Sequence, residues 1–142
     1  MRHLWIVLLG LTGGLVWNAL ADGAAGSAVV LGLIGLGLAW LFSPWQGGRT
    51  DRHQDVLERP VKDRDVVIYW RPGCIFCIRL RGRLGRHGKE ATWVNIWQDP
   101  AAAEFVRGVN GGNETVPTVV IGGEAHTNPD PQEVLDHILA SR

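Results

Sequence analysis

The chain has 142 residues, with 14 basic and 14 acidic side chains, and its formal net charge of zero excludes no class of partner by itself. Residues 1–48 carry only Arg2 and Asp22, whereas the other 26 charged side chains lie in residues 49–142. We therefore expect two parts of different kind, of which the second is long enough to bury a small core without cross-links. Cys74 and Cys77 are only three positions apart, which excludes a disulfide scaffold between distant segments. No histidine has ligand spacing with them, which argues against a zinc site.

Two apolar runs open the chain, at residues 4–20 and 24–42. A helix that crosses a bilayer needs roughly 17–25 apolar residues, so both runs are long enough to span. The turn between them is short, which predicts an antiparallel membrane hairpin over residues 1–46. Tryptophans, which favour the headgroup region, fall near the ends of the runs at Trp5, Trp17, Trp40 and Trp45. Small residues at four-residue spacing, which let helices approach closely in lipid, are Gly10, Gly14, Ala24, Ala28 and Gly32.

Two other interpretations of these runs stay open. The first run can be a cleaved signal peptide, because Arg2 precedes it and Ala19-Leu20-Ala21 resembles a cleavage site. A buried soluble hairpin is disfavoured because neither run has a polar face.

Basic residues flank the pair of runs but not the turn between them, which predicts that both ends are cytoplasmic. We expect residues 49–142 at the cytoplasmic side of the cell membrane whether or not the first run is cleaved. If it is not cleaved, the protein is a multi-pass membrane protein. The flanking basic residues after the second run are Arg49, Arg52, Arg59, Lys62 and Arg64.

Residues 47–64 are polar and include Gly47, Gly48 and Pro60, so we expect a linker that lets the following domain reach away from the membrane. Residues 65–142 alternate between β-branched or aromatic runs and helical patterns. Asp99-Pro100 and Asp130-Pro131 each combine a capping carboxylate with a proline suited to a first helical turn. The predicted order is βαβαββα, an α/β domain, with strands at 66–70, 92–97, 118–121 and 125–127 and helices at 74–88, from 99 and from 130.

The sequence Cys74-Ile75-Phe76-Cys77 falls where a predicted strand meets a predicted helix. A sulfur at a helix N-terminus faces unpaired amide donors and the positive end of the helix dipole, which favours the reactive thiolate. Arg71 adds a positive charge nearby. We therefore expect Cys74 to be the nucleophile and Cys77, one turn further on, to be the resolving thiol. The alternative is a pair of inert small side chains, which the position at a helix start disfavours.

Two further features leave alternatives open. Thr115-Val116-Pro117 precedes a predicted strand, and the residue types alone favour an ordinary proline at a strand start. If the peptide bond is cis, Val116 can instead pair with an extended thiol substrate. Six basic residues without an intervening acid form either a solvated helix face or a surface for anionic lipid headgroups. They lack the interleaved aromatic residues typical of nucleic-acid binding, which we do not expect. They are Arg71, Arg79, Arg81, Arg83, Arg86 and Lys89.

The motifs at residues 70–77 and 115–117 together resemble those of glutaredoxins, and residues 101–119 closely resemble mycoredoxins, actinobacterial relatives that use mycothiol. The resemblance covers about residues 65–142. It implies a thioredoxin-like fold with a four-stranded mixed sheet and a cis bond before Pro117. It implies that Cys74 attacks a protein–mycothiol mixed disulfide, and that a second mycothiol or Cys77 resolves the product. Mycothiol is then the reducing co-substrate, with no bound cofactor, and the expected substrate-binding residues are Arg71, Ile75, Phe76, Thr115, Val116, Pro117, Thr127 and Asn128.

The chain departs from common glutaredoxins at two places. Ile75-Phe76 stands where Pro-Tyr is frequent, which alters the redox poise. Thr127-Asn128-Pro129-Asp130 stands where glutathione-using members hold a glutathione carboxylate, which agrees with a thiol that lacks glutathione's carboxylates. Three rival functions stay open: a tethered thioredoxin-like protein-disulfide reductase, an oxidative-folding enzyme outside the cytoplasm, and a non-enzymatic dimer that holds an iron–sulfur cluster. The oligomeric state does not follow from the sequence.

Overall fold

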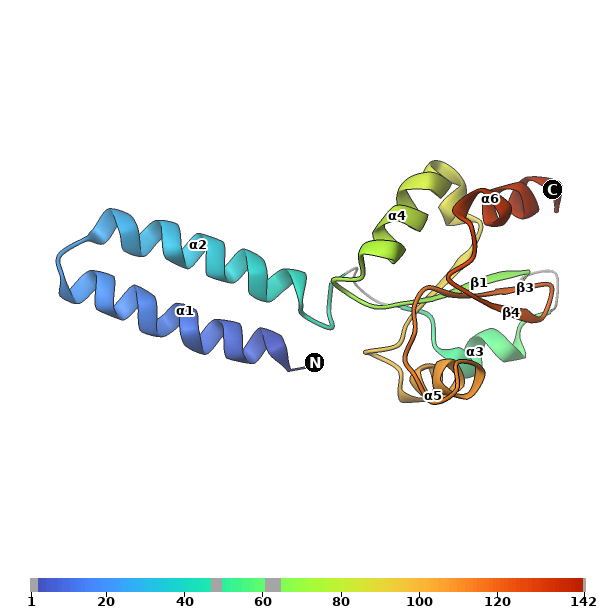
Figure 1. The fold of residues 1–142 in the computed structure, drawn as a ribbon, viewed down its shortest axis with the longest axis horizontal. Helices are drawn as coiled ribbons and strands as arrows, with labels where there is room; N and C mark the ends of the chain where they lie inside the picture. Colours follow the sequence, from blue (N-terminus) through green and yellow to red (C-terminus); the bar gives the residue numbers. More distant parts are fainter. Residues whose placement is uncertain (1–2, 47–49, 61–64, 142) are drawn as a thin grey trace. The chain divides into compact units, whose positions relative to one another are not determined.

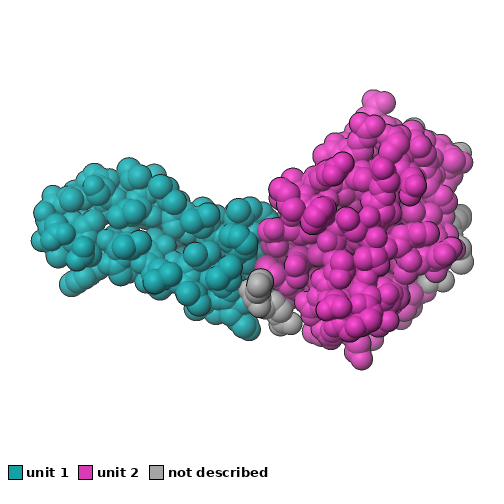
Figure 2. Space-filling view, in the orientation of Figure 1, with its two compact units in different colours: residues 1–48 teal, residues 49–142 magenta. Residues whose placement is uncertain are grey.

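The computed structural model describes residues 3–46, 50–60 and 65–141. The chain divides into two compact units, Met1–Gly48 and Arg49–Arg142, which Figure 2 distinguishes by colour. The first unit is a pair of helices, and the second combines helices with a sheet. Part of the expected linker, residues 47–49 and 61–64, lies outside the described residues. So do four basic residues of the predicted orientation signal, Arg2, Arg49, Lys62 and Arg64.

The first unit is the predicted antiparallel helical hairpin, formed by α1 (Leu4–Ala21) and α2 (Ala25–Leu41) (Figure 1). Gly23, with φ of 74°, allows the tight turn, and the Ala24 N–H donates to the Ala19 carbonyl over 2.9 Å. By length and composition α1 is able to cross a membrane, whereas α2 is apolar but, at 17 residues, shorter. The hairpin is therefore confirmed as a fold.

The two helices pack through only part of the predicted set of small residues: Ala28 is buried and Gly32 faces Val16, whereas Gly35 and Ala39 were not predicted. Ala28, Gly35 and Ala39 are the buried residues of α2. A Cβ added at Gly35 would collide with the Thr12 side chain, so only glycine fits there. Added Cβ atoms at Gly10 and Gly14 would meet nothing within 4 Å, so neither glycine is a site of close approach to α2. Four-residue spacing alone did not indicate which face of α1 meets α2.

The outer surface of the hairpin is covered by large apolar side chains. No residue of α1 is buried, and the tryptophans near the ends of the apolar runs include Trp17 and Trp40, both exposed. Trp5 and Trp45 stack edge to face with ring centroids 5.6 Å apart. A helix surface in water normally carries many polar side chains, but α1 has only two polar residues, Thr12 and Asn18. The other exposed apolar residues include Leu11, Leu15, Val29, Leu33, Ile34 and Leu36.

The second unit is built on a four-stranded sheet with the order β2-β1-β3-β4. Its strands are β1 (Val66–Trp70), β2 (Thr92–Asn95), β3 (Thr118–Ile121) and β4 (Glu124–Thr127). β1 runs parallel to β2 and antiparallel to β3, and Ile68 pairs with Trp93 on one side and Val119 on the other. β3 and β4 form an antiparallel hairpin. The predicted mixed sheet and the βαβαββα order are confirmed.

Helices cover both faces of this sheet (Figure 1). α4 (Ile75–Leu84) and α6 (Pro131–Ala140) lie on one face, where they pack on Val66 and Ile68. α5 (Pro100–Val109) lies on the other face and packs on Val67 and Tyr69. Successive side chains of a strand point to opposite faces, so β1 contributes to both cores, and all five of its residues are buried.

Three local features differ from the sequence prediction. The strand expected over residues 92–97 ends at Asn95, because the chain turns there and the Trp97 N–H donates to Asn95 Oδ1 over 2.9 Å. The helix expected over residues 74–88 ends at Leu84, because Gly85 adopts φ of 51°, and a 3-10 helix, η2 (Gly85–Lys89), follows. Within the expected linker, residues 53–58 form a helix, α3 (His53–Glu58). Val56 of α3 is 1% exposed and belongs to the core on the α5 face. This segment therefore extends the folded domain instead of acting as a free linker.

Candidate active site

Cys74 is the N-cap residue of α4. β1 ends at Trp70, and Gly73, with φ of 71°, turns the chain so that the helix starts directly after Cys74. The Cys77 backbone N–H donates to Cys74 Sγ over 3.2 Å, so the sulfur occupies the position of a capping oxygen. The predicted placement of Cys74 between a strand and a helix is thus observed, and the sulfur faces the first amides of the helix.

A loop from a distant part of the sequence completes the surroundings of this sulfur. When it is protonated, the Cys74 thiol donates to the Val116 carbonyl, with Sγ and oxygen 3.4 Å apart. The Val116–Pro117 peptide bond is cis, as the family resemblance implied. Cys74 is 8% exposed and Cys77 only 3%, so a substrate reaches Cys74 more easily. Both cysteines are present as free thiols.

The two thiols have opposite acidities. The pKa of Cys74 is lowered from 9.0 to about 6, chiefly by the hydrogen bond from the Cys77 thiol. Burial opposes this shift, whereas the backbone N–H groups of Cys77 and Phe76 and the positive charge of Arg71 add to it. The pKa of Cys77 is raised, first by the same hydrogen bond and then by burial and the neighbouring Cys74 charge. At neutral pH Cys74 is therefore a thiolate and Cys77 a protonated donor, which suits Cys74 for attack on a disulfide.

A groove of about 300 Å³ lies beside α4 and brings together three of the predicted site residues, Phe76, Pro117 and Asn128. Asn128 has φ of 48°, and its N–H donates to the Pro117 carbonyl over 2.8 Å, which fixes this side of the groove. Phe76 is 52% exposed and follows Cys74 by two residues. The other lining residues are Arg79, Leu80, Pro129, Asp130 and Pro131. The groove is a candidate site for a small thiol.

The remaining predicted residues have different surroundings. Arg71 is partly exposed, and its charge acts on Cys74. Ile75 is 69% exposed on the outside of α4. The Thr115 carbonyl accepts a hydrogen bond from Thr118 Oγ1 over 2.8 Å, which stabilises the loop before Pro117. Thr127 lies on the exposed strand β4 and donates to Asn110 Oδ1 over 2.5 Å, outside the groove lining.

Three residues near this site were missed by sequence reasoning. Asp130 and Arg79 line the groove. Asp130 was interpreted as a helix start and as part of the stretch that replaces a glutathione carboxylate site, without being named as a site residue, and Arg79 only as part of a basic face. Asn110 ties the end of α5 to β3 and β4, because its Nδ2 donates to Thr118 Oγ1 over 3.0 Å and its Oδ1 accepts from Thr127. The sequence indicated only that Asn110 lies at the end of a helix, and a helix end does not reveal which distant residues its side chain contacts.

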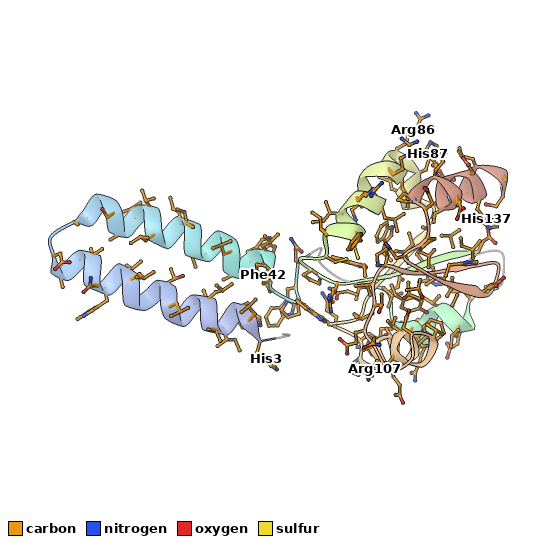
Figure 3. All side chains as sticks on the ribbon, viewed as in Figure 1. His3, Phe42, Arg86, His87, Arg107 and His137 are labelled. Atoms are coloured by element: carbon orange, nitrogen blue, oxygen red, sulfur yellow. The ribbon has the colours of Figure 1, made fainter. Side chains whose placement is uncertain are left out.

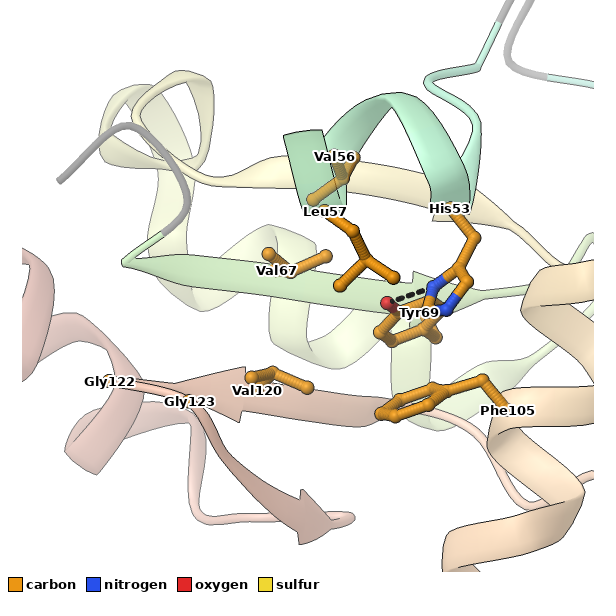
Figure 4. A pocket seen from close by; sticks show the side chains of 9 residues that line it. All are labelled: His53, Val56, Leu57, Val67, Tyr69, Phe105, Val120, Gly122 and Gly123. Carbon is orange, nitrogen blue, oxygen red and sulfur yellow. Dashed lines mark hydrogen bonds between the residues drawn. The ribbon is translucent and has the colours of Figure 1, made fainter. Parts of the chain in front are cut away.

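A second cavity, of about 380 Å³, lies on the α5 face of the sheet and contains none of the predicted site residues (Figure 4). His53 Nδ1 and the Tyr69 hydroxyl are hydrogen-bonded over 2.7 Å, and Phe105 stacks on His53 with centroids 4.9 Å apart. Burial lowers the pKa of His53, and the charge of Asp99 opposes this shift. The polar groups of this cavity are thus already paired with each other. Among the described residues, no three His, Cys, Asp or Glu side chains gather into a metal site.

Known proteins resemble the second unit in sequence. The Glutaredoxin family model matches residues 66–126, which include Cys74, Cys77 and Pro117. A Mycobacterium tuberculosis protein with the name "Putative glutaredoxin" is 44% identical over 70 residues, which are 49% of this chain and 83% of that protein. Mycoredoxin 1 of Corynebacterium glutamicum is 39% identical over 77 residues, 54% of this chain and 95% of that protein. The family model begins at β1, so the hairpin and α3 precede the matched region.

Proposed function

The chain belongs to the glutaredoxin family and is a thiol–disulfide oxidoreductase, and we propose that it reduces mixed disulfides between proteins and mycothiol at a membrane. The observation that carries the catalytic part is the pairing of the two sulfurs. Cys74 has a lowered pKa at a helix N-terminus, and the protonated, less exposed Cys77 stands one turn behind it. Such unequal thiols suit one nucleophile and one resolving group.

In the proposed reaction the Cys74 thiolate attacks the mycothiol sulfur of a protein–mycothiol disulfide. The old disulfide bond breaks, the client protein leaves as a thiolate that takes up a proton, and a Cys74–mycothiol disulfide remains. The thiolate of a second mycothiol then attacks the mycothiol sulfur of that intermediate, which releases mycothiol disulfide and restores the Cys74 thiolate. The Val116 carbonyl, 3.4 Å from Cys74 Sγ, borders the position of the incoming disulfide.

Cys77 offers a second way to resolve the intermediate. Once Cys74 is bonded to mycothiol, the negative charge that raised the pKa of Cys77 is gone. Cys77 then loses its proton more readily and attacks the Cys74 sulfur, which releases mycothiol and forms a Cys74–Cys77 disulfide. This route needs a separate reductant, a further thiol, to restore the two cysteines. We propose the mycothiol route as the main one and the Cys77 route as its alternative.

Mycothiol as the co-substrate is supported by the likeness to Mycoredoxin 1 and by the groove beside α4. Polar groups of Asn128 and Asp130 line this groove together with apolar Phe76 and Pro117. A thiol with many hydroxyl groups has partners for both kinds of surface. We assign substrate contacts to Phe76, Pro117 and Asn128 on this basis.

The hairpin is proposed to anchor the enzyme in the cell membrane as two spans. α1 has the length and composition of a membrane span, and the apolar side chains around both helices need a non-aqueous environment. The turn between the helices carries no basic residue, whereas basic residues lie on both outer flanks. The positive-inside rule then favours a cytoplasmic catalytic domain, where a reducing environment preserves the Cys74 thiolate.

The decisive experiment measures turnover of a mycothiolated protein by the purified full chain in detergent, with mycothiol and its reductase supplied. We expect turnover with mycothiol and much slower turnover with glutathione. Cys74→Ser should abolish the reaction, because no other nucleophile reaches the mixed disulfide. Cys77→Ser should retain it, because a second mycothiol resolves the intermediate. Complete loss in Cys77→Ser would instead establish the dithiol route.

Each rival function predicts a different outcome. Turnover with thioredoxin reductase but not with mycothiol would identify a thioredoxin-like protein-disulfide reductase. An iron–sulfur dimer would give a coloured protein under anaerobic conditions, with no turnover. Labelling of Cys74 in intact cells by a membrane-impermeant thiol reagent would reverse the proposed sidedness and favour an oxidative-folding enzyme outside the cytoplasm.

A further inference from the structure

The outward side of α4 is apolar near Cys74 and basic further along. Ile75 and Ile78, three residues apart, are 69% and 57% exposed, on the side of the helix away from the sheet. Arg79 and Arg83 follow on α4, Arg86 continues in η2, and all three are exposed. We call these five residues the α4 ridge. An unpartnered ridge of this composition resembles the surface of an interfacial helix, which combines apolar and cationic side chains.

The positive charge of the ridge is available to a partner. Arg79, Arg83 and Arg86 form no ion pair with a described carboxylate; Arg83 donates to Gln132 Oε1, with Nε at 2.9 Å. One acid, Asp130, borders a hollow with Arg79 and Arg83, but its carboxylate caps α6 by accepting from the Gln132 N–H over 2.7 Å. The ridge therefore has a net positive charge and is complementary to an anionic surface.

The connection between the hairpin and the domain is short. Thr50 is bound to β2, because its hydroxyl donates to the Trp93 carbonyl over 2.9 Å and accepts from the Asn95 N–H over 2.7 Å. Since α2 ends at Leu41, only residues 42–49 separate the hairpin from this attachment. An extended chain of that length spans roughly 30 Å, about one diameter of a domain of this size. A surface contact of the domain with the bilayer is thus intramolecular, and weak attraction suffices to populate it.

The attachment point lies on the basic side of the domain. Asp51, next to Thr50, borders a hollow together with Arg81, Lys89 and Trp93. Arg81 lies over the Trp93 ring, with its guanidinium carbon 4.4 Å from the ring centroid. The chain therefore enters the domain beside the end of α4 and η2. Because the N–H of His53, three residues after Thr50, donates to Asp99 at the start of α5, the tether by itself selects neither side, and the composition of the ridge is what favours the α4 side.

We propose that the α4 ridge rests on an anionic lipid surface, with Ile75 and Ile78 in the headgroup region and the arginines on lipid phosphates. This inference rests on the proposed membrane anchoring and names the surface at which Cys74 works. Arg79 belongs to the ridge and also lines the groove beside Phe76, so the groove lies at the border of the proposed lipid contact. The clients of this geometry are proteins whose mixed disulfides lie at the membrane surface.

The test places a photoreactive residue on the ridge of the full chain in nanodiscs. In the variant Ile78→p-benzoylphenylalanine, irradiation should cross-link position 78 to lipid in discs of equal parts phosphatidylcholine and phosphatidylglycerol, as read by mass spectrometry. The matched control is Val109→p-benzoylphenylalanine, since Val109 is also an exposed apolar residue, but of α5. We expect a several-fold higher lipid yield at position 78, and a fall in that yield in discs of phosphatidylcholine alone.

Charge reversal tests the arginines separately. Each basic residue near an anionic surface changes the population of the lipid-bound state roughly fivefold. Arg83→Glu with Arg86→Glu removes two such residues and should lower the cross-link yield at position 78 by about 25-fold or more. Arg107→Glu is the control, because Arg86 and Arg107 lie on opposite sides of the second unit (Figure 3). Circular dichroism and cooperative unfolding of each variant report whether it is folded, so that loss of yield is attributed to charge.

The outcomes separate this inference from the proposed function. Equal lipid yields at positions 78 and 109, or yields independent of lipid charge, would overturn the lipid contact and leave the mycothiol reaction standing. Cross-links from position 78 to a protein instead of lipid would overturn it in favour of a protein partner. A chain that does not enter the nanodiscs would refute the membrane anchoring and this inference together, while its turnover in solution would still report on the chemistry.

Discussion

Removal of the Cys77 thiol should raise the pKa of Cys74. The hydrogen bond from that thiol is the largest cause of the lowered pKa of about 6, ahead of the backbone donors and Arg71. Cys77→Ala removes this donor and keeps the Cys77 backbone N–H at Cys74 Sγ, so the pKa should move upward, toward 9.0. Cys77→Ser is the matched control, because its hydroxyl can still donate, and its pKa should stay closer to that of the native protein.

The size of the effect follows from the ionised fraction. At pH 7 a thiol with a pKa near 6 is about 90% thiolate, whereas one with a pKa near 9 is about 1% thiolate. The intrinsic nucleophilicity of a thiolate falls as its pKa falls, with a Brønsted slope of about 0.4–0.5. A pKa lower by three units therefore makes the Cys74 thiolate roughly 16–30 times less nucleophilic, which offsets most of its larger ionised fraction. Cys74 should therefore be alkylated at pH 7 only about three- to sixfold faster than an ordinary thiol, and with a much lower titration midpoint.

Two measurements determine the midpoint: the ultraviolet absorbance of the thiolate against pH, and the pH dependence of alkylation by iodoacetamide. Cys77 does not interfere in the native protein, because its pKa is raised. A Cys77→Ala midpoint equal to the native one would refute the role of the thiol–thiol hydrogen bond and assign the acidity to the helix N-terminus instead. A midpoint near 9 in the native protein would refute the acidity of Cys74 altogether.

Three further predictions concern stability. Gly35→Ala should destabilise the hairpin by about 1–3 kcal/mol in detergent, because the new methyl group collides with Thr12. Gly37→Ala is the control and should not destabilise it, because an added Cβ there has nothing within 4 Å. Thermal unfolding of the two variants in detergent measures the difference. Val56→Ala should lower the free energy of unfolding in urea by about 2 kcal/mol, because Val56 is buried. Leu57→Ala, at the neighbouring residue that is 52% exposed, should lower it by under about 0.5 kcal/mol. Equal losses would show that α3 does not pack on the domain through Val56. Folding lowers the pKa of His53 below 6.5, so the unfolded chain takes up a proton first, and stability should fall as the pH drops below about 6.5. His53→Gln should flatten this slope in urea unfolding measured against pH, and an unchanged slope would assign it to other groups.

The amino-acid sequence by itself determined the features that depend on neighbours along the chain. The two apolar runs predicted the hairpin, because length and lack of charge decide that a helix is apolar all round. The β-branched run before Cys74 predicted a strand, and the turn at Gly73 predicted the strand-to-helix junction that makes this sulfur acidic. The resemblance over residues 101–119 directed attention to mycothiol, which no local pattern indicates.

Only the tertiary structure decided the contacts between distant segments. Val116 reaches Cys74 across 42 residues of sequence, and no periodicity predicts that approach. The close contact of Gly35 with Thr12 depends on how α2 is rotated against α1, which spacing does not specify. Asp130 and Arg79 meet in the groove because α6 packs beside α4, so their positions depend on helix packing.

The linker is the clearest example of this division. A polar stretch with glycines and a proline is typical of a free linker, and a six-residue helix is too short for its periodicity to be detected. Residues 50–60 of the expected linker are structured because Val56 packs into an apolar core and Thr50 is hydrogen-bonded to β2. The sequence therefore determined that a redox domain follows an apolar hairpin. The tertiary contacts decided how short the connection between the hairpin and the domain is. The burial of Val56 and the two hydrogen bonds of Thr50 shorten it, and both depend on a sheet whose strands come later in the sequence.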